Sequence, residues 1–248
     1  MTTKLSEDFT WSATDYDVAF TSNVDVFEIL TGANITVTLT DITFTKITSN
    51  MFLATNASTS EIILNGVKYI IKPETCNGYS DKNWGGDFTS PWVWLSSNKL
   101  FSERKGKYLE DSVFNIGGGR PKVFFVALDR KLLGAFWYEG KNYEFNFSKF
   151  WTLSGTKFDC WETENEIYWH VIQTTATAKL DTRIVCDKKD MLNINYEAPT
   201  GLKRHNRLWN GGTGTGVLKL YKRSFGKETL IDTILAENIG CEFGEYDR

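Results

Sequence analysis

The sequence predicts an all-β protein, an antiparallel barrel or sandwich with few helices. Three observations predict this class. Apolar and polar residues alternate with a period of two through most of the chain after Tyr16, as in strands with one buried and one solvated face. No window carries a long apolar repeat with the helical period, so few helices are expected. Short turn sequences rich in Gly, Asn and Asp separate these segments at regular spacing.

The first strands follow from this alternation and from one turn. An Ile-Thr-Val-Thr-Leu sequence at residues 35–39 predicts one strand, and residues 42–47 predict the next. Residues 60–71 predict a hairpin whose turn is Asn65-Gly66, because this pair tolerates the positive φ that a type I′ turn requires.

The glycine-rich runs are interpreted as turns or bulges. A phosphate loop needs its glycines between a strand and the start of a helix. Residues 117–121 and 211–216 each precede another β-like run instead, so neither is a nucleotide-binding fingerprint. The charged segment after Leu100 is expected to be an exposed loop. The chain is expected to form a single unit, residues 1–248; a soft boundary between two β halves would fall near residues 100–111.

The second half of the chain is expected to be a meander with short polar turns. Residues 132–138 and 142–150 predict a hairpin, and the second arm alternates aromatic residues with Glu, Asn and Ser. Further strands are expected at residues 158–163, 167–175, 178–186, 191–196, 217–223 and 229–239.

The composition limits the classes of function that the chain can have. The chain has 248 residues, with 41% hydrophobic and 24% charged residues, which are ordinary values for a globular protein. The net charge is -3 and no long run of Lys or Arg occurs, which argues against nucleic acid as a partner. No window approaches the roughly 18 apolar residues of a membrane helix, and the amino terminus lacks the apolar core of a signal peptide. We therefore expect no integral membrane segment and a cytoplasmic location, whereas the oligomeric state is open.

Several kinds of chemistry have no matching motif. The four cysteines are widely spaced without a C-x-x-C pair, so they are expected to be reduced packing residues. His170 and His205 are the only histidines and no H-E-x-x-H motif is present, so no protein-built transition-metal site is expected. The G-x-S-x-G motif of α/β-hydrolases is also missing.

One stretch, residues 79–100, concentrates aromatic, ionisable and amide side chains: Y-S-D-K-N-W-G-G-D-F-T-S-P-W-V-W-L-S-S-N-K-L. Its last part alternates, with Trp92 and Trp94 on one face of a strand and Val93 and Leu95 on the other. One face is therefore strongly aromatic. Such a face fills a core, or it lines a site for an apolar ligand that has a few polar groups.

Two motifs resemble a known family. G-Y-x-D-K-N-W-G followed by P-W-x-W-x-x-x-N resembles the signature of the tocopherol cyclase-like family, part of a wider lipocalin-like group that includes carotenoid hydratases. Residues 197–223, E-A-P-T-G-L … G-V-L-K-L-Y-K-R, resemble the family's late segment and the strand after it. The resemblance runs over roughly residues 60–246. The matching positions of the first motif are Gly78, Tyr79, Asp81, Lys82, Asn83, Trp84, Gly85, Trp92, Trp94 and Asn98.

The resemblance implies a lipocalin-like β-barrel whose pocket binds a hydrophobic isoprenoid or polyketide-like molecule. The implied activity needs no cofactor: an acid promotes cyclisation, hydration or isomerisation of an alkene. A carboxylic acid protonates the double bond, and aromatic faces stabilise the resulting cation. Asp81 is the candidate acid. The other candidates are Tyr79 and Asn83 to position the substrate, Trp84, Trp92 and Trp94 to face the cation, Asn83 and Asn98 to bond a phenol or hydroxyl, and Arg204 with His205 to orient a polar head group or relay a proton.

Each assignment has a structural alternative. Asp81 lies beside Lys82 and could be an ion-paired turn residue, and the tryptophans could pack two sheets together. The basic cluster at residues 203–207 could be a solvated loop. Two other functions are open: a non-catalytic carrier of a lipid or small molecule with the same fold, and a carbohydrate-binding or carbohydrate-active β-sandwich.

Overall fold

The computed structural model of the chain describes residues 2–4, 9–12, 35–39, 43–46, 51–56, 61–64, 67–70, 77–79, 92–119, 122–123, 126–127, 131–197 and 204–244. Side chains are described at residues 67–68, 70, 92–119, 131–194 and 208–244. The chain divides into two compact units, residues 1–82 and 83–248, and each is described by itself. The all-β prediction is confirmed, because the described residues contain no α-helix, only the 3₁₀ turns η2 (Phe150–Thr152) and η3 (Lys188–Asp190).

The first unit contains two four-stranded antiparallel sheets, ordered β1-β4-β5-β8 and β2-β3-β6-β7. Its predicted strands are confirmed as β3 and β4. The predicted hairpin is confirmed as β6 and β7, whose ends Leu64 and Val67 pair with each other. The bounds are β1 Thr2–Lys4, β2 Phe9–Ser12, β3 Ile35–Leu39, β4 Thr43–Lys46, β5 Met51–Asn56, β6 Glu61–Leu64, β7 Val67–Ile70 and β8 Asn77–Tyr79.

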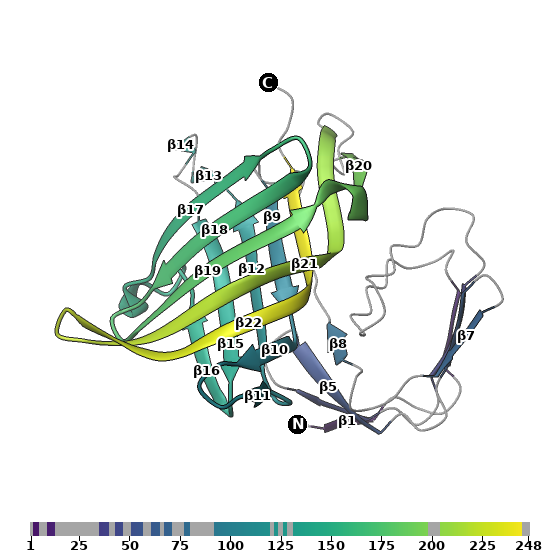
Figure 1. Cartoon of the computed structure of the whole chain (residues 1–248), viewed down its shortest axis with the longest axis horizontal. Coiled ribbons are helices and arrows are strands. Elements are labelled where there is room, and N and C mark those ends of the chain that lie inside the picture. The colour runs from purple at the N-terminus through teal and green to yellow at the C-terminus, as the bar shows by residue number, and fades with distance from the viewer. Residues whose placement is uncertain are drawn as a thin grey trace. The chain divides into compact units, whose positions relative to one another are not determined.

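The second unit is built on one twelve-stranded antiparallel sheet, drawn in teal to yellow in Figure 1. Its main order is β16-β15-β12-β9-β22-β21-β19-β18-β17; β10 and β20 pair with β22 and β21, and β11 pairs with β10. The bounds are β9 Trp92–Ser97, β10 Lys99–Ser102, β11 Lys107–Tyr108, β12 Val113–Gly119, β15 Lys131–Tyr138, β16 Lys141–Phe145, β17 Gly155–Glu162, β18 Glu166–Thr174, β19 Ala178–Asp187, β20 Met191–Glu197, β21 Arg204–Ser224 and β22 Lys227–Gly244. Strands β13 (Lys122–Val123) and β14 (Val126–Ala127) form a separate small hairpin.

The two longest strands, β21 and β22, organise this sheet. Strand β21 pairs with β20 through its first half and with β19 through its second half. Strand β22 pairs with β21 along its length, and on its other edge with both β9 and β10. The hairpin of β21 and β22 therefore joins the meander of β17 to β19 to the strands that carry the aromatic motif.

The sheet curls into a half-barrel (Figure 1). Strands β15 and β18 are far apart in the strand order, yet Gln173 Nε2 on β18 donates a hydrogen bond to Leu132 O on β15, at 3.0 Å. Gln173 also lies directly over Gly134 of β15, where an added β-carbon would be 2.0 Å from its Oε1. The concave face is thus closed over by its own side chains.

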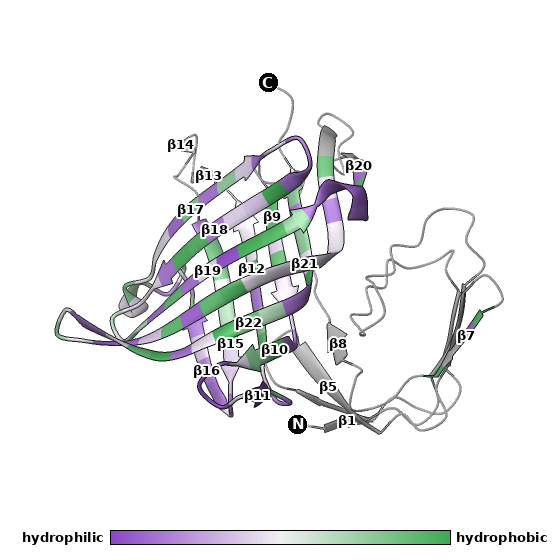
Figure 2. Cartoon of the chain, viewed as in Figure 1, coloured by the Kyte–Doolittle hydropathy of each residue, from purple (hydrophilic) through white to green (hydrophobic). Residues whose placement is uncertain are grey.

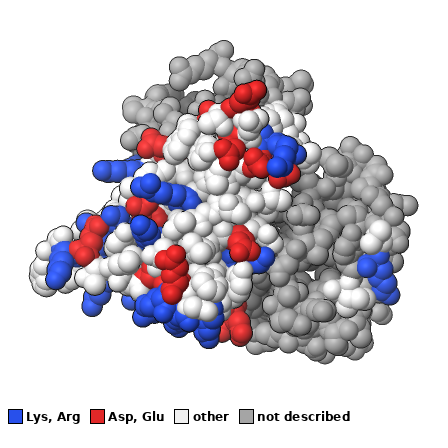
Figure 3. All heavy atoms as spheres, in the orientation of Figure 1, with Lys and Arg blue, Asp and Glu red and all other residues white. Residues whose placement is uncertain are grey.

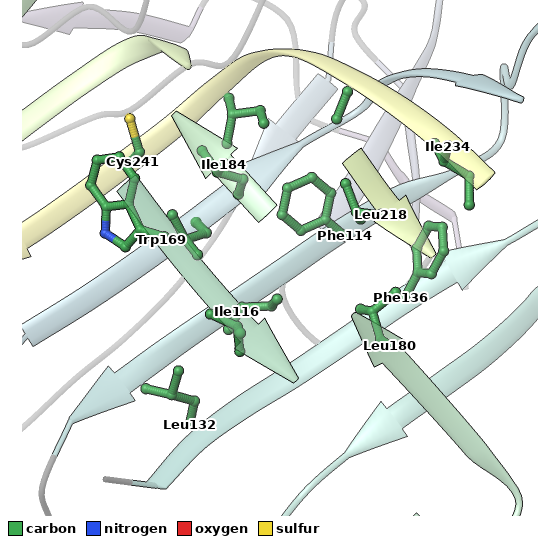
Figure 4. Packing of buried hydrophobic residues seen from close by; sticks show 14 of the residues in the cluster. Phe114, Ile116, Leu132, Phe136, Trp169, Leu180, Ile184, Leu218, Ile234 and Cys241 are labelled. Atoms are coloured by element: carbon green, nitrogen blue, oxygen red, sulfur yellow. The ribbon is translucent and has the colours of Figure 1, made fainter. Parts of the chain in front are cut away.

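Alternation along the strands separates a concave core from a polar convex face. Figure 2 shows hydrophobic and hydrophilic residues alternating along β18, β19 and β21, and Figure 3 shows cations and carboxylates interspersed on the face in view. Figure 4 shows the core between strands from both sides of the half-barrel. Its largest fully buried side chains are Trp169, Phe114, Phe136, Phe145, Leu95, Leu100, Ile116, Leu132, Ile167, Leu180 and Leu218.

Of the two interpretations of the glycine-rich runs, turns are wrong, and bulges are confirmed within residues 211–216, where the pairing of β21 with β22 shifts register. Strand β12 continues through Gly119, and β21 continues through all of residues 211–216, with register shifts in this segment. Close packing explains the glycines: a β-carbon at Gly216 would lie 2.4 Å from the carbonyl oxygen of Arg183 on the neighbouring strand. A glycine run in a strand marks a bulge or a close approach as often as a turn.

The segment after Leu100 is exposed, as predicted, at residues 103–108 and 110–111, while Ser102 and Leu109 within it are buried. Two local predictions need their bounds corrected. The predicted strand at residues 142–150 ends at Phe145, and η2 follows. The later strands up to β20 lie close to their predicted positions, but β21 begins at Arg204 rather than at Val217, and β22 continues to Gly244 rather than ending at Ile239. Residues 100–111 lie inside the second unit and contribute β10 and β11 to its sheet; the single unit with a soft boundary in this segment stays a prediction.

Candidate functional site

The aromatic face of β9 lies opposite the core. Val93 and Leu95 are fully buried in the concave core, whereas Trp92 and Trp94 point to the convex face and are half-buried. The predicted alternation is therefore confirmed. Neither tryptophan belongs to the buried hydrophobic cluster of the second unit. The alternative in which they pack two sheets together stays a prediction.

A carboxylate lies beside Trp92 on the same convex face. The indole Nε1 of Trp92 donates a hydrogen bond of 2.5 Å to Oε2 of Glu242 on β22. The other oxygen, Oε1, accepts a hydrogen bond of 2.9 Å from Asn210 Nδ2 on β21. The register explains this meeting, since Glu242 pairs with Trp94 across the β22–β9 ladder and with Asn210 across the β21–β22 ladder.

Two glycines make room for the ring of Trp94. A β-carbon added at Gly240 on β22 would lie 2.6 Å from Cζ3 of this ring, and one at Gly117 on β12 would lie 3.5 Å from its Cδ1. The indole therefore lies across the glycines of both neighbouring strands. Such a close approach of a flat ring to the backbone holds its orientation.

The electrostatics of this face suit a cation. The carboxylate of Glu242 accepts hydrogen bonds from two N–H donors, Trp92 Nε1 and Asn210 Nδ2. A carboxylate thus lies at the N–H edge of an indole ring, and indole faces attract cations through their quadrupole. We call Trp92, Trp94, Asn210 and Glu242 the tryptophan–carboxylate face. Chemically, it can orient an apolar substrate and stabilise positive charge that develops on it.

Asn98 lies elsewhere, at a corner of the sheet. It forms the bend between β9 and β10, where Asn238 of the facing strand β22 has a positive φ of 48°. Ser97 Oγ donates to Glu237 O at 2.6 Å and accepts from Lys99 N at 3.0 Å, which fixes this bend. The position of Asn98 is that of a half-buried residue where two strands change direction, as at barrel corners.

The other predicted site residues are described only in part or not at all. The backbone of Tyr79 ends β8 and pairs with Met51. Arg204 and His205 begin β21, where they pair with Glu197 and Tyr196, so this basic cluster is a strand rather than the predicted loop. Asp81, Asn83 and Trp84 lie outside the described residues. Their roles stay predictions.

A second polar cluster lies within the core, and no sequence motif indicates it. The buried carboxylate of Asp232 accepts hydrogen bonds from Ser102 Oγ and, at 2.9 Å, from the hydroxyl of Tyr138. Its Oδ1 also accepts a bond from the backbone N of Arg104, and Arg104 Nη2 donates to the Tyr138 hydroxyl. Burial raises the pKa of Tyr138 above its usual range. These bonds fix the turn after β10, so we assign this cluster to stability.

Sequence reasoning missed Glu242 and Asn210. The alternation G-C-E-F-G at residues 240–244 does place Glu242 on the face opposite Cys241. This pattern predicts that Glu242 lies on the polar face of its strand. It does not predict which side chains Glu242 contacts, because those contacts depend on how β22 pairs with β9. Among the described residues, no group of three or more His, Cys, Asp or Glu side chains could hold a metal ion.

Fold and site together define an all-β protein whose main sheet forms a half-barrel with a tryptophan–carboxylate face. The family model described as "Tocopherol cyclase-like" matches residues 43–245, and the chain belongs to this family. The resemblance recognised in the two motifs is thereby confirmed. No solved structure matches the chain.

One curated relative is the "Probable tocopherol cyclase, chloroplastic" of Oryza sativa subsp. japonica. It is 30% identical over 109 residues, which cover 43% of this chain and 22% of that protein. The matched stretch thus spans about a fifth of the length of that relative. In the part of the chain that the structure describes, no helix has the length and apolar character needed to cross a membrane.

Proposed function

We propose that the chain catalyses acid-promoted ring closure of a prenylated phenol or a similar isoprenoid that carries an alkene and a hydroxyl group. Membership of the tocopherol cyclase-like family supports this reaction class. The single structural observation that carries the proposal is the tryptophan–carboxylate face, in which Glu242 accepts a hydrogen bond from Trp92. A carboxylate together with indole rings is suited to stabilise a carbocation in a site of low polarity.

The proposed reaction is an isomerisation. A carboxylic acid transfers its proton to one alkene carbon, and the neighbouring carbon becomes cationic. The phenol oxygen then forms a C–O bond to that carbon, and the phenolic proton goes to the carboxylate that the first step produced. Atoms and electrons balance without an oxidant, a reductant or a cofactor.

The tryptophan–carboxylate face has two roles in this proposal. Trp92 and Trp94 present aromatic surface to the isoprenoid chain and to the cation. Glu242 holds the indole of Trp92 in one orientation and supplies negative charge that is fixed before the cation forms, so little reorganisation is needed. Glu242 is therefore a positioning residue with respect to Trp92.

The motif residues before β9 have roles that rest on the family signature alone. Asp81 is the proposed proton donor, with Tyr79 and Asn83 as substrate-positioning residues and Trp84 as a further aromatic wall. Asn98, Arg204 and His205 are the proposed contacts for a hydroxyl or polar head group. The proposal does not depend on how these residues are placed relative to one another.

The test compares two carboxylate variants from the same motif. Asp81→Asn is expected to abolish turnover of a prenylated hydroquinone while leaving its affinity, measured by tryptophan fluorescence, nearly unchanged. Asp87→Asn, which removes another acidic side chain six residues away in the sequence, is the matched control and is expected to keep full activity. Undiminished turnover in Asp81→Asn removes Asp81 from the mechanism. Tight binding by the native chain without any turnover contradicts catalysis and identifies a carrier.

A further inference from the structure

Large apolar side chains project into solvent at one end of the half-barrel. Phe150, Trp151 and Leu153, in and just after η2, are 82%, 66% and 72% exposed. Phe225, at the tip of the β21–β22 hairpin, is fully exposed. Most exposed apolar residues occur singly and need no explanation. A group of this size in neighbouring loops marks an interaction surface.

These side chains share one end of the sheet because three connections are tied together. The backbone N of Ala176, in the β18–β19 turn, donates to Thr152 O of η2 at 3.3 Å. The same turn is bonded to the long hairpin, since Arg223 N donates to Thr177 O at 2.8 Å. Figure 1 shows η2, this turn and the hairpin tip together at the left edge of the half-barrel. We call the four side chains Phe150, Trp151, Leu153 and Phe225 the loop-tip patch.

The loops present these residues in fixed conformations. Thr152 Oγ1 donates to Lys149 O at 2.8 Å, and the rings of Phe150 and Trp151 pack edge to face, with their centroids 5.1 Å apart. Phe225 has a positive φ of 46°, a backbone conformation that favours Asn or Gly. A fully exposed phenylalanine in that position gains nothing from the fold. Its apolar ring is therefore best explained by a partner.

The charge around the loop-tip patch is positive. Residues 144–157, 174–179 and 222–228 contain six Lys or Arg residues and two Glu residues, whereas the whole chain carries a net charge of -3. The six are Lys149, Lys157, Lys179, Lys222, Arg223 and Lys227. Glu144 pairs with Lys149, and Glu228 pairs with Lys179 and lies near Arg223. Figure 3 shows several Lys and Arg side chains at the left edge, where this end of the sheet lies, with Asp or Glu side chains among them. Apolar tips within a basic rim are complementary to a surface with an apolar interior and anionic head groups.

We propose that the loop-tip patch docks the protein on an anionic lipid bilayer. The tips are convex and belong to separate loops, so they suit insertion between lipid head groups better than the flat, well-packed contact of a protein interface. Trp and Phe are favoured at the level of the head groups, and the lysines remain at the anionic surface. This docking does not depend on the proposed reaction, because the patch is separate from the tryptophan–carboxylate face.

Vesicle flotation with the full chain tests the docking. The native protein is expected to float with phosphatidylcholine vesicles that contain phosphatidylglycerol, and to bind less as salt increases. The double substitution Trp151→Ser with Phe225→Asn is expected to lower the partition coefficient at least tenfold, because two large apolar side chains no longer insert. Asn suits the positive φ at position 225, so the hairpin keeps its turn, and a thermal melt checks that the fold is unchanged.

Trp161→Ser is the matched control. Trp161 is also an exposed tryptophan, but it stacks on Tyr168 near the β17–β18 turn, at the other end of these strands. This variant is expected to float like the native protein. Equal loss of binding in the control, or no flotation of the native chain, overturns the proposal. Sedimentation velocity adds a last outcome: a dimer that the double substitution dissociates, with no vesicle binding, assigns the patch to a second copy of the chain instead.

Discussion

Trp92 and Glu242 are 150 residues apart in the sequence, and the indole of the first donates a hydrogen bond to the carboxylate of the second at 2.5 Å. The contact exists because β22, the last strand, pairs with β9. Trp92 of the aromatic motif therefore contacts the carboxylate of Glu242 only after β22 has paired with β9. The proposed site is a property of the assembled half-barrel and not of the motif alone.

Replacing Glu242 tests the charge on this face. Glu242→Gln keeps the size of the side chain and removes the charge, so the cation loses a fixed counter-charge. We expect kcat to fall about tenfold with little change in KM, since the charge acts mainly in the transition state. Glu237→Gln, on the same strand, where Glu237 pairs with Lys99 at the surface, is the control and should keep full activity. Equal rates in both variants would contradict the role given to Glu242.

Two glycines test the orientation of the Trp94 ring. Gly240→Ala places a β-carbon 2.6 Å from the ring and must displace it, whereas Gly117→Ala meets the ring at an ordinary contact distance of 3.5 Å. We expect Gly240→Ala to lose stability by about 1–3 kcal/mol from overpacking and to lose most of its turnover. Gly117→Ala should behave like the native protein. Urea denaturation and steady-state kinetics on both variants decide this, and unchanged turnover in Gly240→Ala would show that the ring orientation is irrelevant.

The contact between Gln173 and Gly134, which closes the concave face, leads to a prediction about stability. Gly134→Ala drives a β-carbon into the amide of Gln173, so we expect a loss of about 1–3 kcal/mol in the free energy of unfolding. Adding Gln173→Ala removes the obstacle. The double variant should therefore be more stable than the sum of the two single effects predicts, by about 0.5–3 kcal/mol. Simple additivity in urea denaturation would mean that β15 and β18 do not meet as described.

The raised pKa of Tyr138 leads to a prediction of how the free energy of unfolding falls at alkaline pH. Burial raises the pKa of its hydroxyl; the hydrogen bond from Arg104 opposes this shift, and the bond to Asp232 adds to it. The folded pKa therefore exceeds the unfolded value of about 10. The resulting stabilisation is fully present below about pH 10 and is lost as the pH rises through the folded pKa. Tyr138→Phe cannot ionise, so its stability should fall less steeply than that of the native chain above about pH 10. Parallel curves in urea denaturation would contradict this account.

The sequence predicted local features well and long-range pairing poorly. Alternation placed Trp92 and Trp94 on one face of a strand, and Asn65-Gly66 correctly joined β6 to β7, because both signals are contained in a few neighbouring residues. Glu242 and Asn210 could not be assigned to the site, since their positions depend on the pairing of β21, β22 and β9. The run that begins at Gly117 was interpreted as a turn or bulge and no pattern indicated a role for Gly240, whereas in the structure the ring of Trp94 lies against both. The buried Asp232 likewise gave no sequence signal.

The central claim is tested most directly by ring closure in deuterated water. The native chain is incubated with a prenylated hydroquinone in D₂O, without added cofactor, and the product is analysed by mass spectrometry and NMR after exchange of its hydroxyl protons. The account predicts a cyclic ether that is an isomer of the substrate with one deuterium bound to carbon, at the alkene position that the acid protonates. An unchanged substrate, a product that has gained water, or a ring closed without deuterium on carbon would contradict it.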